Sequence, residues 1–140
     1  MGLEPIQDVA GTRTTTTAFF HVAATNTLSI PIFRATGACV IESVRVVYGF
    51  AVTGHGANTN NINLDTRTSA YAVPTEIANI DHGAGADAVA NTSIAFTGIT
   101  ADESALTDGM YLCAELEEIG DGLAAGFGPI SFVVEWRPEE

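Results

Sequence analysis

Residues 38–65 read ACVIESVRVVYGFAVTGHGANTNNINLD, and this stretch decides the fold class. Its first half is dense in valine, isoleucine, tyrosine and phenylalanine, which fit a pleated, half-buried surface. The Gly-His-Gly turn and the asparagines after it tolerate positive φ. We therefore expect one long strand over residues 40–52, with a bend or bulge at Gly49. A second strand follows, in which Ile62 and Leu64 alternate with polar residues.

Two shorter strands are expected before this stretch. One covers residues 19–24, and the other covers residues 28–34, where every second position is apolar. Pro31 cannot donate a hydrogen bond to a sheet, so its strand should lie at an edge or at a bulge. Residues 1–17 contain a run of four threonines and show no apolar periodicity. We interpret them as an extended N-terminal arm, followed by a single domain over residues 18–140.

The chain beyond this stretch adds one long connection and further strands. Residues 66–88 are irregular apart from one short strand at 71–73, and a connection of this length usually serves function or an interface. Residues 98–109 hold a single helical turn or an acidic loop. Strand-like alternation is found at residues 89–97, 111–118 and 130–136. With about eight strands and no longer helical pattern, the expected fold is all-β, a single antiparallel β-sandwich or barrel.

The chain is strongly acidic. Asp and Glu number 17 against 5 Lys and Arg, which gives a formal net charge of −12. All basic residues are arginines: Arg13, Arg34, Arg45, Arg67 and Arg137. Binding to a phosphate backbone requires a basic patch, and five scattered arginines do not make one. We therefore expect neither nucleic acid nor a membrane as a partner.

Residues that carry chemistry are scattered along the chain. His21, His55 and His82 lie in separate segments, without the spacing of metal ligands. No serine occupies a Gly-x-Ser-x-Gly turn, and neither Cys39 nor Cys113 has a basic neighbour that would make it a thiolate. We expect buried free thiols, and a Cys39–Cys113 disulfide is possible only if the two strands are neighbours. The expectation is no enzyme, no metal and no cofactor, and two carboxylates meeting in a cleft are the one catalytic arrangement left open.

Five stretches carry a likeness to a known family: IFRATGACVIESV (32–44), AVTG (51–54), NINL (61–64), LTDGMYL (106–112) and GDGL (120–123). Through them the chain resembles the small β-sandwich head-decoration (cement) proteins of tailed bacteriophages, over most of residues 28–136. The resemblance implies a jelly-roll-like sandwich, commonly a trimer. It also implies assembly in the host cytoplasm and a place on the outer capsid surface, where such proteins bridge subunits of the major capsid protein. The family has no catalytic residues to carry over.

Contact residues for such a partner are expected in the arm and at two aromatic side chains. An extended arm can lay backbone hydrogen bonds along a partner's sheet edge. Trp136 continues the apolar face of the last strand, so core packing is the favoured interpretation, and an interface anchor is the alternative. The candidate interface residues are Arg13, Thr14, Thr15, Thr16, Thr17, Tyr71 and Trp136.

A second function class competes with the first. A receptor- or carbohydrate-binding sandwich, such as a domain of a fibre or spike, should expose aromatic side chains on one loop face. Tyr71, Tyr111 and Phe127 are the candidates for that role. A glycan array on which no sugar is bound would count against this second function.

Overall fold

The computed structural model describes residues 11–19, 28–120 and 128–139, and within them it contains nine strands and no helix. The strands are β1 (Arg13–Phe19), β2 (Leu28–Arg34), β3 (Cys39–Tyr48), β4 (Thr59–Arg67), β5 (Thr75–Asp81), β6 (Ser93–Ala95), β7 (Ala105–Leu106), β8 (Tyr111–Ile119) and β9 (Ile130–Pro138). No helix among the described residues is long and apolar enough to cross a membrane.

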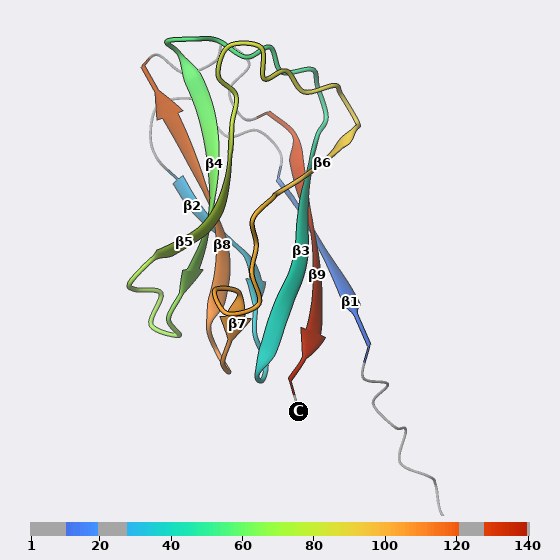
Figure 1. Cartoon of the computed structure of the whole chain (residues 1–140), viewed down its shortest axis with the longest axis vertical. Coiled ribbons are helices and arrows are strands. Elements are labelled where there is room, and N and C mark those ends of the chain that lie inside the picture. Colours follow the sequence, from blue (N-terminus) through green and yellow to red (C-terminus); the bar gives the residue numbers. More distant parts are fainter. Residues whose placement is uncertain (1–10, 20–27, 121–127, 140) are drawn as a thin grey trace, which may run out of the picture.

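The strands form two antiparallel sheets that face each other (Figure 1). One sheet has the order β1-β9-β3-β6, with β7 also paired to β3, and the other has the order β2-β8-β4-β5. The pairs are nested: β1 with β9, β2 with β8, β3 with β6 and β7, and β4 with β5. Nested antiparallel pairs wound into two sheets make a jelly roll. The prediction of an all-β, jelly-roll-like antiparallel sandwich is confirmed.

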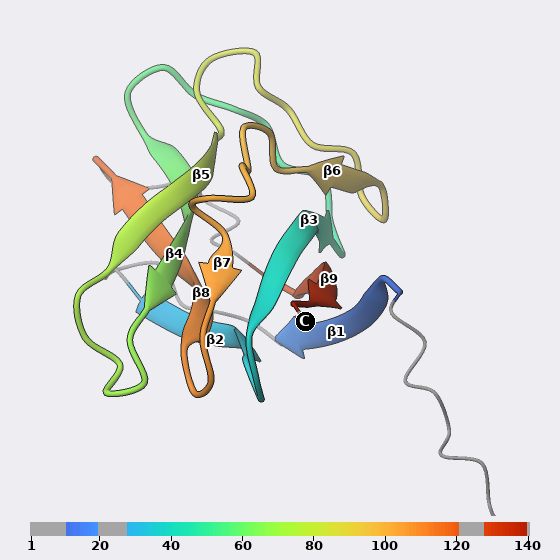
Figure 2. The same ribbon diagram turned by 60° about the horizontal axis from the view of Figure 1, so that its bottom comes forward.

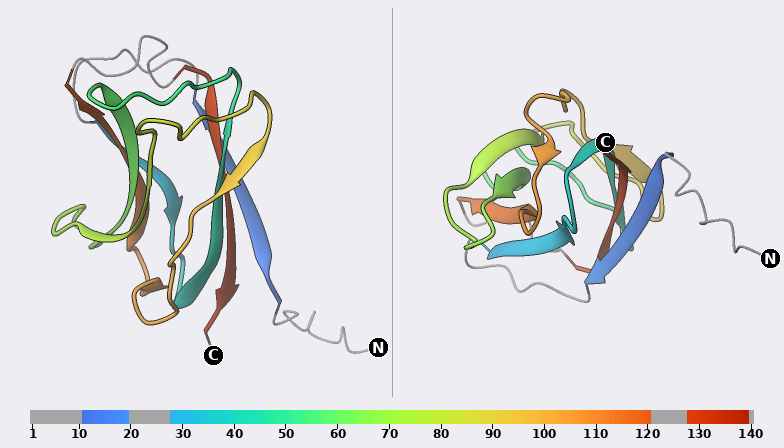
Figure 3. Two further views of the ribbon diagram at one scale, coloured as in Figure 1. Left: turned by 45° about the horizontal axis from the view of Figure 1, so that its top comes forward. Right: turned by 90° about the horizontal axis from the view of Figure 1, so that it is seen from below.

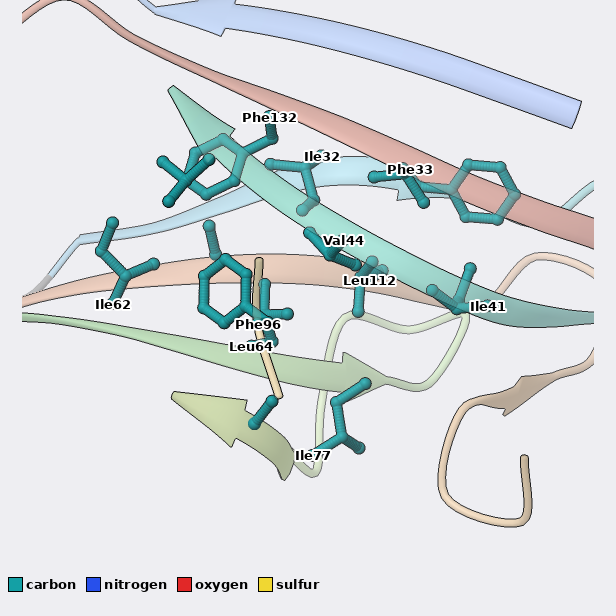
Figure 4. Close-up of a cluster of buried hydrophobic side chains, with 14 of the residues drawn as sticks. Ile32, Phe33, Ile41, Val44, Ile62, Leu64, Ile77, Phe96, Leu112 and Phe132 are labelled. Carbon is teal, nitrogen blue, oxygen red and sulfur yellow. The ribbon is translucent and has the colours of Figure 1, made fainter. Parts of the chain in front are cut away.

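The core fills the space between the sheets with alternate residues of the central strands (Figure 4). Leu112, Ala114 and Leu116 of β8 are fully buried, as are Phe132 and Val134 of β9. Burying a large apolar side chain contributes about 1.5–3 kcal/mol, so this layer is the main source of stability.

The long central strand β3 keeps its apolar residues inward by means of a bulge. Its register with β9 shifts between Ile41 and Ser43, so Ile41 and Val44 are both buried although they are three residues apart. The strand ends at Tyr48, short of the predicted end at residue 52, and the bend predicted at Gly49 follows it. The prediction that Pro31 lies at an edge or at a bulge is confirmed on both counts. β2 is an edge strand, and its register with β8 shifts between Pro31 and Phe33.

The N-terminal boundary differs from the prediction. Residues 13–17, assigned to the arm, form most of β1 and pair with β9 from Arg13 opposite Trp136 to Thr17 opposite Phe132. A run of threonines shows no apolar periodicity that would indicate a strand, but the β-branched side chain of threonine fits one. By pairing with β9, β1 also covers a sheet edge that would otherwise be exposed. Residues 1–10 lie outside the described residues, as does most of the strand predicted at 19–24.

The predicted irregular connection at 66–88 is also wrong in part. β4 continues to Arg67, and β5 covers Thr75–Asp81, so only the turn between them and the segment after β5 are irregular. The short strand predicted at 71–73 is a tight turn, in which Tyr71 and Val73 have φ of 59° and 53°. Tyrosine and valine favour strands, but the hydrogen bond from Tyr71 N to Thr68 O (2.8 Å) closes a turn here instead.

Cys39 and Cys113 are buried free thiols. They lie in β3 and β8, which belong to different sheets, so they are not neighbours in a ladder. Burial raises the pKa of both thiols. Both side chains therefore remain protonated and act as small apolar groups.

Candidate functional site

The candidate site lies where the edge strands of the two sheets meet. β1 ends one sheet and β2 ends the other, and Figures 2 and 3 show them side by side along one flank of the sandwich. The Thr17 hydroxyl donates to the Ile32 carbonyl oxygen at 2.9 Å and ties the two edges together. Beside this tie a groove of about 520 Å³ opens, which we call the edge groove. It is lined by Thr15, Pro31, Ile32, Phe33, Arg34, Thr36, Tyr111 and Trp136.

The sequence of β1 explains why the sandwich stays open here. Thr14 and Thr16 are exposed on its outer face, whereas Arg13, Thr15 and Thr17 alternate with them and are half-buried. A polar side chain loses free energy when it is buried without a hydrogen-bond partner. The inward positions of β1 hold one arginine and two threonines, where the central strands hold apolar side chains.

Trp136 forms one wall of the edge groove and is fixed on three sides. Its ring lies 5.2 Å from that of Phe33, which belongs to the core. Its indole N–H donates to the Thr15 hydroxyl at 3.3 Å, and the Arg13 guanidinium lies 5.2 Å above the ring. Trp136 thus packs against the core, as the favoured interpretation expects, and also lines the groove.

From Arg34 and Tyr111 of the groove lining, a row of two rings between two arginines continues over the outer face of the β2-β8-β4 sheet. Arg34 lies 5.8 Å from the centre of the Tyr111 ring, and Tyr71 meets Tyr111 edge-on at 5.4 Å. Arg67 lies 5.1 Å from the Tyr71 ring. We call these four residues the tyrosine row. A cation over an aromatic face contributes about 0.5–1 kcal/mol at an exposed position.

The two arginines of the tyrosine row differ in charge partners. Arg67 pairs with Asp65 at 3.3 Å and approaches Glu115 at 4.0 Å. Arg34 is exposed and forms no ion pair within the described part of the chain. The residues that line the edge groove include no Asp or Glu. The groove is therefore a locally cationic place on a strongly acidic protein.

A pair of carboxyl groups, those of Asp65 and Glu115, lies next to Arg67 of the tyrosine row. Asp65 is buried, and its hydrogen bond to Glu115 raises the pKa of the Glu115 carboxyl. Burial and the charge of Asp65 act in the same direction, whereas Arg67 opposes them. Neither carboxyl lines the edge groove.

The histidines have structural partners where they are described. His82 is buried, and its Nδ1 lies 2.8 Å from the Ala86 carbonyl oxygen. A carbonyl only accepts, so Nδ1 carries the proton, and the Tyr48 hydroxyl donates to Nε2 at 2.7 Å. His55 Nδ1 accepts from the backbone of its own loop tip. His21 lies outside the described residues, and the described ranges contain no group of three His, Cys, Asp or Glu that could hold a metal ion.

The structure brings together part of the predicted interface set. Arg13, Thr15 and Trp136 meet at the edge groove, and Tyr71 reaches it through Tyr111. Thr14 and Thr16 point to the other face of β1, and Thr17 ties the edges. Phe127, a candidate of the second hypothesis, lies outside the described residues.

Arg34 and the lining residues Pro31, Ile32 and Phe33 were not among the predicted interface residues. Arg34 follows an alternating strand that Pro31 marks as an edge, and this was the available signal. The pattern alone could not reveal that β2 lies beside β1, because residues 13–17 were predicted as an arm rather than as a strand.

Comparisons with known proteins add little. No family model and no curated protein matches the chain. A solved structure described as that of infectious bursal disease virus, Gx strain, aligns with 99% of this chain and 41% of its own, at 16% identity and a TM-score of 0.35. The chain thus spans well under half of that protein. A TM-score this low supports no inference about function.

Proposed function

We propose that this chain is a structural virion protein, a decoration subunit that binds the outer surface of a phage head and stabilises it by bridging coat subunits. The observation that carries the proposal is the edge groove, an open, locally cationic site on a jelly-roll sandwich. Tryptophan, tyrosine and arginine are the residues most enriched at the energetic centres of protein interfaces, and all three line this groove. Jelly rolls occur in viral capsid proteins but also in lectins and cupins, so the fold does not distinguish these functions and the proposal rests on the site.

Two of the stretches that carry the resemblance to decoration proteins meet beside this groove. Ala35, just after β2, donates its N–H to the Met110 carbonyl oxygen at 2.9 Å. The Gly109 N–H donates in return to the Ala35 carbonyl oxygen at 2.9 Å. This pairing holds the ends of β2 and β8 together and so positions Arg34 next to Tyr111. The resemblance and the candidate site therefore involve the same part of the fold.

We propose a homotrimer as the assembled form. Edge strands expose unpaired backbone groups that attract other chains, and closed assembly hides them. A net charge of −12 makes copies repel one another, so contacts between copies should use the less acidic surfaces. The same charge requires a capsid surface that is neutral or basic overall.

A binding assay with phage heads tests the function. The purified chain is mixed with expanded heads and with compact precursor heads, and bound protein is measured after sedimentation. We expect binding to expanded heads, weak binding to precursors, and a trimer by light scattering. A monomer that binds neither particle would refute the proposal.

The receptor- or carbohydrate-binding hypothesis keeps one supporting observation. Trp136 and Tyr111 both line the edge groove, whose volume of about 520 Å³ falls within the range of small-ligand sites. A glycan array probed with the labelled chain separates the hypotheses. Specific sugar binding without head binding would favour this second function.

A further inference from the structure

We infer that the edge groove receives an extended segment of a coat subunit that presents a carboxylate to Arg34 and an apolar side chain to Trp136. This inference rests on the proposed decoration function and adds the chemistry of the partner segment.

The first argument is charge complementarity. The chain carries only five arginines against 17 acids, yet Arg34 lines the groove and Arg13 lies over the ring of its Trp136 wall. Arg34 is exposed, and within the described residues its charged group contacts the Tyr111 ring but no carboxylate. A guanidinium presents its N–H donors in a planar fork that matches a carboxylate. The group that completes this site is therefore an acid supplied from outside.

The charge of the whole chain limits what kind of anion can bind. A polyanion would gain one or two arginines at the groove and would be repelled by the excess of 12 negative charges elsewhere. A single carboxylate on an otherwise neutral or basic surface avoids that repulsion. Such an isolated acid is common on a protein segment and absent from a nucleic acid.

The second argument is the preformed apolar wall. Trp136 rests on Phe33, and its indole N–H is held by Thr15, so the ring is positioned before any partner arrives. Pro31 adds an apolar lining next to it. A rigid aromatic wall of this kind lowers the entropy cost of binding. It favours a partner with an apolar or aromatic side chain close to its carboxylate.

The third argument concerns the shape of the partner. Among the described strands β1 pairs only with β9 and β2 only with β8, so the groove runs between two strand edges that have no second partner in that part of the chain. An extended segment can add to such an edge through its backbone. Pro31 lacks an N–H and weakens the β2 edge for that purpose, which leaves the β1 edge. The tie between Thr17 and Ile32 closes one end, so the segment enters from the end marked by Arg13 and Arg34.

A charge-reversal pair tests the inference. Arg34→Glu and Arg45→Glu change the net charge equally, but Arg45 is exposed on β3, outside the groove, where it contacts Ser93 at 3.2 Å. Affinity for expanded heads is measured by sedimentation with fluorescently labelled protein. We expect Arg34→Glu to weaken binding at least about tenfold, and Arg45→Glu to change it by less than about twofold. Arg34→Lys should give an intermediate affinity, because lysine keeps the charge but loses the planar fork.

A cross-linking experiment identifies the occupant directly. A photoreactive phenylalanine analogue replaces Thr36, which is exposed and lines the groove. After irradiation on expanded heads, mass spectrometry should find the cross-link on a coat segment that contains Asp or Glu beside an apolar residue. A cross-link to a segment without an acid would overturn the inference.

The outcomes separate this inference from the function on which it rests. Equal binding of the Arg34→Glu and Arg45→Glu variants, with wild-type protein bound to heads, would overturn the groove inference and leave the decoration function standing. Failure of the wild-type chain to bind heads would overturn both. Binding of sialyllactose that is lost in Arg34→Glu, without head binding, would assign the groove to an acidic sugar and also overturn the inference.

Discussion

Arg67 and Arg34 make the same kind of contact in opposite surroundings. Each lies over a tyrosine of the tyrosine row, on the same face of the same sheet. Arg67 is mostly buried and is neutralised by carboxylates of its own chain, whereas Arg34 is exposed and meets no carboxylate among the residues that the structure describes. Removing a buried charge partner is costly, but removing an exposed, unpaired charge is not. The difference shows which arginine serves the fold and which is available to a partner.

Removal of the groove wall should have the largest effect. Trp136→Ala deletes a ring that packs on Phe33 and holds Thr15 and Arg13 in place. We expect a loss of about 3 kcal/mol in the free energy of unfolding, because large-to-small changes at packed aromatic positions cost about 3–5 kcal/mol and this ring is only half-buried. Urea denaturation measures the loss, and Trp136→Phe should recover most of it. A variant as stable as wild type would show that Trp136 serves assembly alone.

Removal of Arg67 should come next. Arg67→Ala leaves the buried Asp65 beside Glu115 without a counter-charge. Breaking such a pair typically costs about 3–5 kcal/mol when it is fully buried, so we expect about 2–3 kcal/mol here. Chemical denaturation at pH 7 provides the measurement. If Arg67→Ala and Arg34→Ala were equally stable, the contrast between the two arginines would be wrong.

The carboxyl pair predicts the sign of a pH effect. The pKa of Glu115 is raised in the folded chain, first by its hydrogen bond to Asp65, so the folded state holds this proton more tightly than the unfolded state. Stability should therefore increase as the pH falls from 7 through the raised pKa, and the gain should level off below the ordinary glutamate pKa of about 4.3. The raised pKa of Glu118, caused by burial, acts in the same direction.

An amide at position 115 checks this assignment. Glu115→Gln can donate to Asp65 at every pH, so its melting temperature at pH 7 should equal or exceed that of wild type. Its stability should also rise less between pH 7 and pH 5 than that of wild type, as followed by thermal scans. An unchanged pH profile would place the effect elsewhere.

Removal of Arg34 should have the smallest effect on folding. Arg34→Ala loses one exposed contact with the Tyr111 ring, so we expect a loss of no more than about 0.5 kcal/mol. The same denaturation series that contains Arg67→Ala measures it. A loss as large as 2 kcal/mol would mean that Arg34 supports the fold, and its assignment to a partner would need to be abandoned.

Much of the sandwich could be predicted because its central strands have strong local patterns. Alternation at Ile62 and Leu64, and at Leu112 and Leu116, marks strands with one buried face, and Pro31 marks an edge. The turn at Tyr71 was predicted as a strand, because tyrosine and valine favour strands. The sequence does not show that Tyr71 has a positive φ, which accompanies the local hydrogen bond between its N–H and the Thr68 carbonyl oxygen. The four threonines were predicted as part of an arm, because a run of identical residues shows no alternation of apolar and polar side chains.

The candidate site was predicted only in part for a different reason. Arg13, Thr15 and Trp136 were singled out from sequence, but nothing in the sequence joined them to Arg34 and Tyr111. The groove exists because β1 and β2 end different sheets and lie side by side, and because a bulge near Pro31 sets the register of β2.

The sequence by itself determined the all-β class, the inward faces of the central strands, the acidic surface and the edge character of β2. These properties depend on single residues and on a two-residue period, which are local. Only the tertiary structure decided that residues 13–17 complete a sheet, that Arg67 is neutralised while Arg34 has no ion pair among the described residues, and that Arg34, Tyr111 and Trp136 line one groove. These properties depend on which strands pair and in which register, and a shift of one residue would turn every side chain to the other face.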